Sequence, residues 1–87
     1  MPGSPVARIG DTHDCPIHGQ NEVTTGCQSV KANSRPVARI GDQTGCGAKI
    51  VTGAARTKAG GMPVARLGDQ TDHGGTIVTG SPNVVAG

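Results

Sequence analysis

PVARIGD at residues 5–11 returns as PVARIGD at 36–42 and as PVARLGD at 63–69. A second short module follows each copy of this heptad, namely VTTG at 23–26, IVTG at 50–53 and IVTG at 77–80. Units that recur in this way stack on one another, because each covers an apolar face that its neighbour cannot bury alone. The sequence therefore predicts one domain spanning 1–87, built from three repeats at about 5–35, 36–62 and 63–87.

The spacing of the modules predicts that the repeats close on themselves. Fifteen residues separate Asp11 from Gly26, whereas eleven separate the matched residues of the second and third repeats, so the first repeat carries a four-residue insertion. The third repeat has only seven residues after Gly80, and residues 1–4 can supply the missing length. We expect a closed pseudo-threefold arrangement, and an open β-solenoid is the alternative.

Each repeat is expected to form short strands. VARI alternates apolar with small or polar residues, Gly-Asp then favours a turn, and the β-branched residues of IVT also favour strands. Fifteen glycines and six prolines leave no stretch for a long helix. We predict an all-β fold. Since proline cannot donate to a sheet ladder, the repeated prolines should begin strands; they are Pro5, Pro36 and Pro63.

The composition predicts that a packed apolar core is not the main source of stability. The chain has no aromatic residue and only 33% hydrophobic residues. A net charge of +2 is too small to indicate nucleic-acid binding and too small for typical disorder, although disorder of the metal-free chain stays an alternative. With no apolar stretch of about 20 residues and no signal peptide, we expect synthesis in the cytoplasm.

An arginine lies three residues before the aspartate that ends each heptad. Because each cation has its own carboxylate, we predict surface ion pairs worth about 0–1 kcal/mol each, and not a phosphate-binding triad. The pairs are Arg8 with Asp11, Arg39 with Asp42, and Arg66 with Asp69.

All three histidines and two of the three cysteines follow the Gly-Asp turns. Counted from each aspartate, Cys15, Cys46 and His73 share one position, four residues on. Imidazole and thiolate suit tetrahedral zinc, so we predict one zinc per chain where the three loops converge. Five candidates compete for about four places: His13, Cys15, His18, Cys46 and His73. Cys27 aligns with small residues of the other repeats and is expected to pack in the core.

The heptads, followed by the loops HDCPIHG (13–19), CG (46–47) and HGG (73–75) and the IVTG modules, resemble the PAAR-repeat family over essentially the whole chain. The resemblance implies a small β cone with zinc near its apex, held by three histidines and one cysteine. Carried over by loop, these ligands are His13, His18 and His73, with Cys46 as the thiolate. Cys15 stays a further candidate because it shares the register of Cys46, although three adjacent ligands from one tight loop would be strained.

The resemblance also implies a structural role. Family members cap and sharpen the trimeric VgrG-type spike of type VI secretion systems, carry effectors and puncture membranes. We expect one chain per spike trimer, assembly in the cytoplasm, translocation into the target cell when the sheath contracts, and transient contact with the target membrane. The spike tip of a related phage-like contractile particle is an alternative with the same architecture.

Two further function classes are less favoured. A minimal zinc hydrolase would need an open metal position and a general base, for which the candidates are Asp14, Glu22 and Asp72, but four protein ligands close the site. A zinc-ribbon nucleic-acid binder would need aromatic residues on which bases stack, and the chain has none. We therefore predict that the protein is not an enzyme and binds no nucleic acid.

Overall fold

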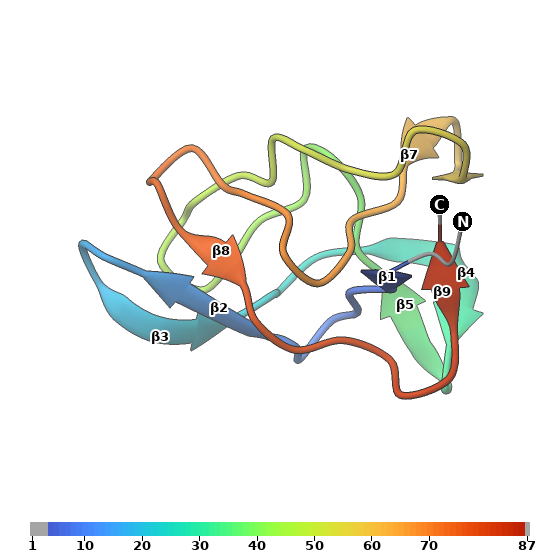
Figure 1. Ribbon diagram of the computed structural model, residues 1–87, viewed down its shortest axis with the longest axis horizontal. Helices are drawn as coiled ribbons and strands as arrows, with labels where there is room; N and C mark the ends of the chain where they lie inside the picture. The colour runs from blue at the N-terminus through green and yellow to red at the C-terminus, as the bar shows by residue number, and fades with distance from the viewer. Residues whose placement is uncertain (1–3, 87) are drawn as a thin grey trace.

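A computed structural model describes residues 4–86, which form nine short strands and no helix. At one end of the molecule, β2 (Thr12–Cys15) lies between β3 (Gly19–Glu22) and β8 (Thr76–Ile77) in an antiparallel sheet (Figure 1). We call this end the apex. The all-β class predicted from the sequence is confirmed.

The opposite end, which we call the base, consists of three two-stranded antiparallel pairs (Figure 1). The first two are hairpins and the third joins the two ends of the described chain. They are β4 (Cys27–Ala32) with β5 (Arg35–Val37), β6 (Lys58–Ala59) with β7 (Met62–Pro63), and β1 (Ser4–Pro5) with β9 (Val85–Ala86).

Two-residue turns with positive φ make the two base hairpins. Asn33 and Ser34 connect β4 to β5 with φ of 55° and 68°, and Gly60 and Gly61 connect β6 to β7 with φ of 58° and 83°. Turns with positive φ at both central positions match the right-handed twist of paired strands. Asparagine and glycine tolerate this conformation best, which explains their place here.

The three heptads meet in the middle of the molecule through main-chain hydrogen bonds. The Ala7 N–H donates to the Ala65 carbonyl at 3.0 Å, the Ala38 N–H to Ala7 at 2.9 Å, and the Ala65 N–H to Ala38 at 2.8 Å. These bonds form a closed cycle, which we call the heptad ring. VARI was expected to form short strands, but apart from Val37, which ends β5, it makes isolated bridges, because its residues pair with more than one neighbouring segment.

The prediction that the repeated prolines begin strands is wrong. Pro5 and Pro63 end β1 and β7, and Pro36 lies in the middle of β5. Each of these strands pairs with a neighbour on one side only. Proline is tolerated in such edge strands, because a nitrogen that faces the unpaired side has no hydrogen bond to lose.

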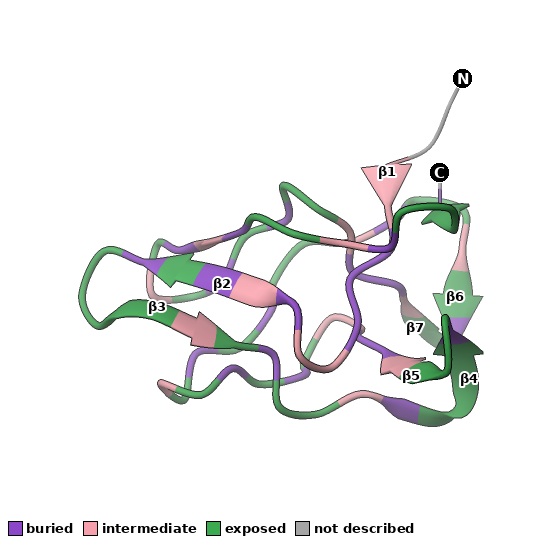
Figure 2. Ribbon diagram, turned by 90° about the horizontal axis from the view of Figure 1, so that it is seen from below, coloured by how far each residue is buried: buried purple, intermediate pink, exposed green. Residues whose placement is uncertain are grey.

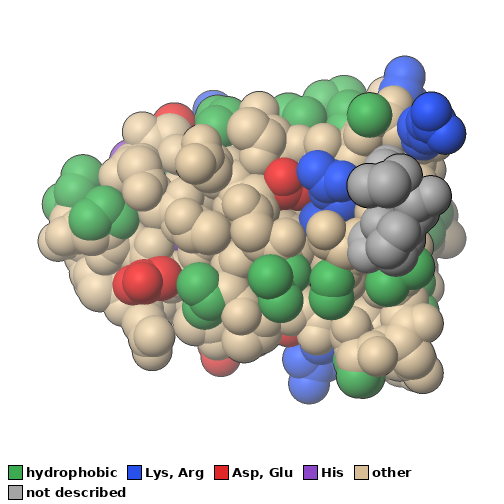
Figure 3. Space-filling view, viewed as in Figure 1, with side chains coloured by type: hydrophobic (Ala, Val, Ile, Leu, Met, Phe, Trp, Pro, Cys, Tyr) green, Lys and Arg blue, Asp and Glu red, His purple; other side chains and the backbone are tan. Residues whose placement is uncertain are grey.

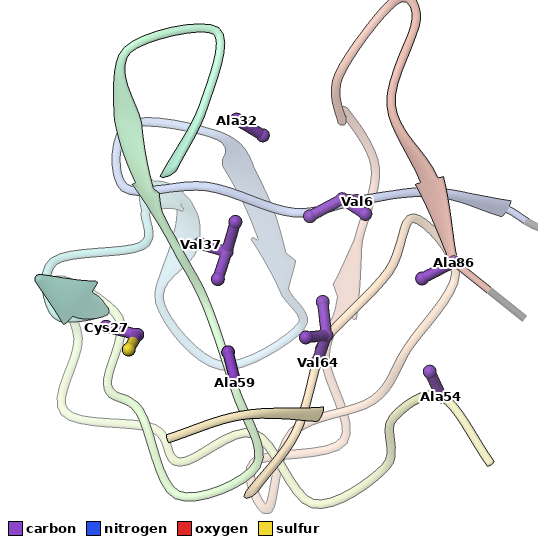
Figure 4. Packing of buried hydrophobic residues seen from close by; sticks show 8 residues of the cluster. All are labelled: Val6, Cys27, Ala32, Val37, Ala54, Ala59, Val64 and Ala86. Carbon is purple, nitrogen blue, oxygen red and sulfur yellow. The ribbon is translucent and has the colours of Figure 1, made fainter. Parts of the chain in front are cut away.

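Small buried side chains fill the interior in two clusters. The cluster toward the base contains Val6, Val37 and Val64, which hold matched positions in the three heptads and surround its middle (Figure 4). Cys27 belongs to the same cluster, so its predicted packing role is confirmed. The second cluster combines the heptad alanines with module residues: Ala7, Val23, Ala38, Ile50, Ala65 and Ile77.

The three predicted arginine–aspartate ion pairs are confirmed, but their predicted surface location is wrong, because they lie in buried joints between repeats. The aspartates at the ends of the heptads expose only 4–7% of their surface. Each accepts the main-chain N–H of its own arginine at 2.6–2.7 Å and a threonine hydroxyl from another repeat at 2.9 Å. The threonine donors pair with the aspartates as Thr25 with Asp42, Thr52 with Asp69 and Thr79 with Asp11. One carboxylate therefore ties each repeat to the next.

The molecule measures 31 × 26 × 22 Å and narrows toward the apex (Figure 3). Hydrophobic side chains gather on this narrow end, over the turn between β2 and β3, where Ile17 is 67% exposed. Among residues 4–86 the structure contains no helix long and apolar enough to cross a membrane. The predicted metal loops therefore lie at the narrow end of the molecule, and the three strand pairs lie at the wide end.

Candidate metal centre

Strand β2 and its turn supply two of the grouped side chains. Along β2, burial alternates: His13 and Cys15 face inward, and Asp14 faces solvent (Figure 2). The turn at 16–18 then brings His18 back beside the strand end, where its Nδ1 lies 3.5 Å from the Cys15 Sγ. The four-residue insertion of the first repeat is thus used to form a hairpin at the apex.

The loops of the second and third repeats supply the other two side chains. The Cys46 Sγ lies 3.7 Å from the His73 Nδ1. Together, Cys15, His18, Cys46 and His73 place one ligand atom each within 4.8 Å of all the others. Cys15 is buried, Cys46 and His73 are partly exposed and His18 is exposed, so the group extends from the interior to the surface of the apex.

The donor set fits a tetrahedral metal ion such as zinc. With Zn–S of about 2.3 Å and Zn–N of about 2.0–2.1 Å, neighbouring sulfur and nitrogen ligands of a tetrahedral site are about 3.6 Å apart. The sulfur–nitrogen distances between Cys15 and His18 and between Cys46 and His73, 3.5 and 3.7 Å, agree with this separation. Two thiolates and two imidazoles therefore lie close enough together to bind one ion.

Hydrogen bonding prepares Cys46 to act as a thiolate. The Thr44 hydroxyl, 3.3 Å from the Cys46 Sγ, is the largest influence on the thiol, and the Ala48 backbone, His73 and Cys15 act in the same direction. Burial opposes them, but the net effect lowers the pKa of the Cys46 thiol to about 5. Since the thiolate is the form that binds metal, this thiol is ready to bind at neutral pH.

His13 lies beside this group and not within it. The side chain is completely buried; its Nδ1 is 3.1 Å from the Asn21 Oδ1 and its Nε2 is 2.9 Å from the Thr71 Oγ1. Its Nδ1 lies 4.0 Å from the Cys46 Sγ. Of the ligands predicted from the resemblance, the structure brings together His18, Cys46 and His73, with Cys15 as the fourth.

The repeat register contained a signal for this grouping. Cys15, Cys46 and His73 all lie four residues after a heptad aspartate, whereas His13 lies two residues after Asp11. The residues matched to His13 in the other repeats are Thr44 and Thr71, both buried. Register therefore favours Cys15 over His13 as the contribution of the first repeat.

The carboxylates considered for a hydrolase lie around the apex. Asp14 and Glu22 are exposed on β2 and β3. The Asp72 carboxylate accepts the Lys49 N–H at 3.0 Å and lies 3.9 Å from the His73 Nε2.

Fold and site together define a small all-β domain whose narrow end can be cross-linked by a metal ion. A family model described as the PAAR motif matches residues 1–52 of the 87. The match covers more than half of the sequence, so the chain belongs to the PAAR motif family, and the resemblance is confirmed. This is a family of structural, non-enzymatic proteins at the tip of the type VI secretion spike, where they bind VgrG. No curated protein matched the sequence.

Proposed function

We propose that this chain is the structural tip that caps and sharpens a trimeric VgrG-type spike of a type VI secretion system, one chain per trimer. The PAAR motif match is the observation that carries the proposal. The narrow apex and the wide base support it, because such a shape concentrates force at one end and leaves the other end for docking (Figure 3).

The three strand pairs of the base support docking on a trimer. They lie at matched positions of the sequence repeat, with pairings Ala32–Arg35, Ala59–Met62 and Ala86–Ser4. A single chain with pseudo-threefold repeats would present one similar edge to each spike subunit, and main-chain bonding at such edges is the usual mode of β-augmentation. Three copies of the chain could not share the axis of one trimer.

At the apex, we propose one zinc ion bound by Cys15, His18, Cys46 and His73. It supplies a cross-link, since its ligands come from all three repeats. Four protein ligands leave no open position on a tetrahedral ion, which fits a structural and not a hydrolytic role. The exposed Ile17 at the same end would be among the first side chains to meet the target membrane during translocation.

The test is co-expression with the trimeric spike protein of the same cell, followed by native mass spectrometry. We expect a complex of one chain, one zinc and three spike subunits. Val85→Asp should weaken the complex, because Val85 lies on β9 at the base with 59% of its surface exposed. Val51→Asp, at a 48% exposed position outside the strand pairs, is the matched control and should bind normally.

Three chains per trimer, or no binding to a spike trimer, would contradict the capping proposal. If the trimer that binds is the spike of a phage-like contractile particle, the tip role stands and the machine is the alternative one.

A further inference from the structure

His13 has both imidazole nitrogens engaged. The Asn21 Nδ2 donates to the Gly19 carbonyl at 3.1 Å, which turns the Asn21 Oδ1 toward His13. Because this oxygen can only accept, the Nδ1 of His13 carries the proton, and in the neutral imidazole Nε2 accepts from the Thr71 hydroxyl. A metal binds an unprotonated ring nitrogen, so His13 has none to offer while these bonds persist.

His13 also lies one level deeper than the grouped ligands. Residues two apart on a strand share a face and are separated by about 6.6 Å along it, which places His13 below Cys15 on β2. The Thr71 hydroxyl bonds His13, and the Thr44 hydroxyl bonds Cys46. We call His13, Thr44 and Thr71 the polar level. It lies beneath the four grouped ligands and supports them.

The third repeat leaves room for the imidazole. A Cβ at Gly75 would lie 2.2 Å from the His13 Nε2 and 2.7 Å from the Asp14 carbonyl. The matched residue in the second repeat, six residues after its aspartate, is Ala48, so that repeat has a Cβ where the third repeat has none. The imidazole of His13 therefore fills the space that a side chain at position 75 would take, and only glycine leaves that space open.

We infer that His13 is a positioning residue: it links β2 to β3 through Asn21 and to the third repeat through Thr71, and so holds Cys15 and His73, while Cys15 binds the metal. The inference rests on the proposed metal site. It assigns this chain two cysteine and two histidine ligands, in place of the three histidines and one cysteine implied by the family resemblance. His13 would act on the metal through its neighbours.

Cobalt(II) is a suitable probe, because its absorption reports both the number of thiolates and the ligand geometry. We expect His13→Gln to keep the wild-type band positions and thiolate intensity while binding metal about 10–100-fold more weakly, the usual cost of losing a group that orients ligands. Cys15→Ser should lose one thiolate contribution. A His13→Gln spectrum with altered ligand-field bands, together with a wild-type spectrum for Cys15→Ser, would overturn the inference. If His13→Gln does not fold, His13→Thr, the residue of the matched positions, replaces it.

Nuclear magnetic resonance of the wild-type protein gives a readout independent of any variant. With ¹¹³Cd bound, the imidazole nitrogens of His18 and His73 should couple to the metal, and His13 should show a protonated Nδ1 and no coupling. Coupling from either nitrogen of His13 would disprove the positioning role. A wild-type chain that takes up no metal would defeat the proposed metal site instead, and a proton on Nε2 in that chain would then count against the hydrogen-bonding scheme as well.

Discussion

At the scale of single residues, the heptad aspartates explain how a chain with so little apolar bulk is held together. Asp11 accepts bonds from its own Arg8 and from Thr79, a residue 68 positions away. The Arg8 side chain is only 10% exposed and bonds both carboxylate oxygens, at 3.0 Å each. Bonds to a buried charge contribute more than exposed ion pairs do, so this joint is expected to be a main support of the fold.

Asp11→Asn is predicted to destabilise the protein by about 2–3 kcal/mol, because the guanidinium of Arg8 loses its counter-charge in a buried setting. Urea denaturation of the zinc-loaded protein measures the effect. Glu22→Gln, an exposed position on β3, is the control and should change stability by less than about 0.5 kcal/mol. Equal stability of the two variants would show that the joint is dispensable.

The Asp11 carboxylate is also expected to make the stability of the protein depend on pH. Burial alone would raise the pKa of Asp11, but hydrogen bonds from Arg8 and Thr79 outweigh burial and hold this pKa below its ordinary value. The stabilisation is therefore complete above the unfolded pKa of about 3.9 and is lost as the pH falls through the lower folded pKa. The stability difference between wild type and Asp11→Asn should stay constant from pH 7 to 5 and shrink below pH 4. Denaturation curves over this range test it, and a gap that persists unchanged at pH 3 would contradict it.

At the scale of elements, the β2–β3 hairpin decides where the first-repeat ligands lie. Its register pairs Cys15 with Gly19 and His13 with Asn21, so one strand serves both the ligand group and the polar level beneath it. Strand β8 then packs on β2 through the pairing of His13 with Ile77. The large side chain in the first repeat is accommodated by a glycine in the third.

Gly75→Ala is predicted to destabilise the apex by about 1–3 kcal/mol, the usual cost of overpacking. In a His13→Thr background the cost should be smaller by about 1 kcal/mol, because one of the two clashes is removed, while the contact with the Asp14 carbonyl remains. A double-mutant cycle by chemical denaturation measures this coupling. Gly45→Ala, where the nearest atom would lie 3.4 Å from the new Cβ, is the control. Additive costs would show that the two residues do not compete for space.

At the scale of the whole molecule, two different kinds of link close the chain. The heptad ring and the aspartate joints connect the three repeats through hydrogen bonds, and the proposed metal connects them again at the apex. The buried cluster that contains Val6, Val37 and Val64 lies toward the base. Loss of the metal is therefore expected to affect the two ends unequally.

Elemental analysis should find one zinc per chain, and a strong chelator should loosen the protein severely, because metal binding in such small domains contributes on the order of 10 kcal/mol to folding. Hydrogen exchange should show protection falling first in β2, β3 and β8 and later at the base. Zinc added back should restore the original pattern. A metal-free protein with unchanged exchange at the apex would contradict the proposed site.

Much of the fold and the region of the metal site follow from the sequence alone. Three heptads with β-branched modules and frequent glycines predicted an all-β fold, and the confinement of His and Cys to the turn loops predicted where a metal could bind. The base hairpins were missed, although the pairs Asn33-Ser34 and Gly60-Gly61 are of the kind that form two-residue turns. Such patterns are readable because they depend on local conformational preference and on repetition.

Only the tertiary structure decided which partners these residues meet. The heptad aspartates were expected at the surface, because the sequence shows only that each follows its arginine by three residues. It does not show that a threonine from another repeat covers the carboxylate. The choice between His13 and Cys15 likewise depends on depth along β2 and on the room left by Gly75, a residue 62 positions from His13. Residue types and their periodicity are properties of the sequence, whereas burial and hydrogen-bond partners depend on which distant segments the folded chain brings together.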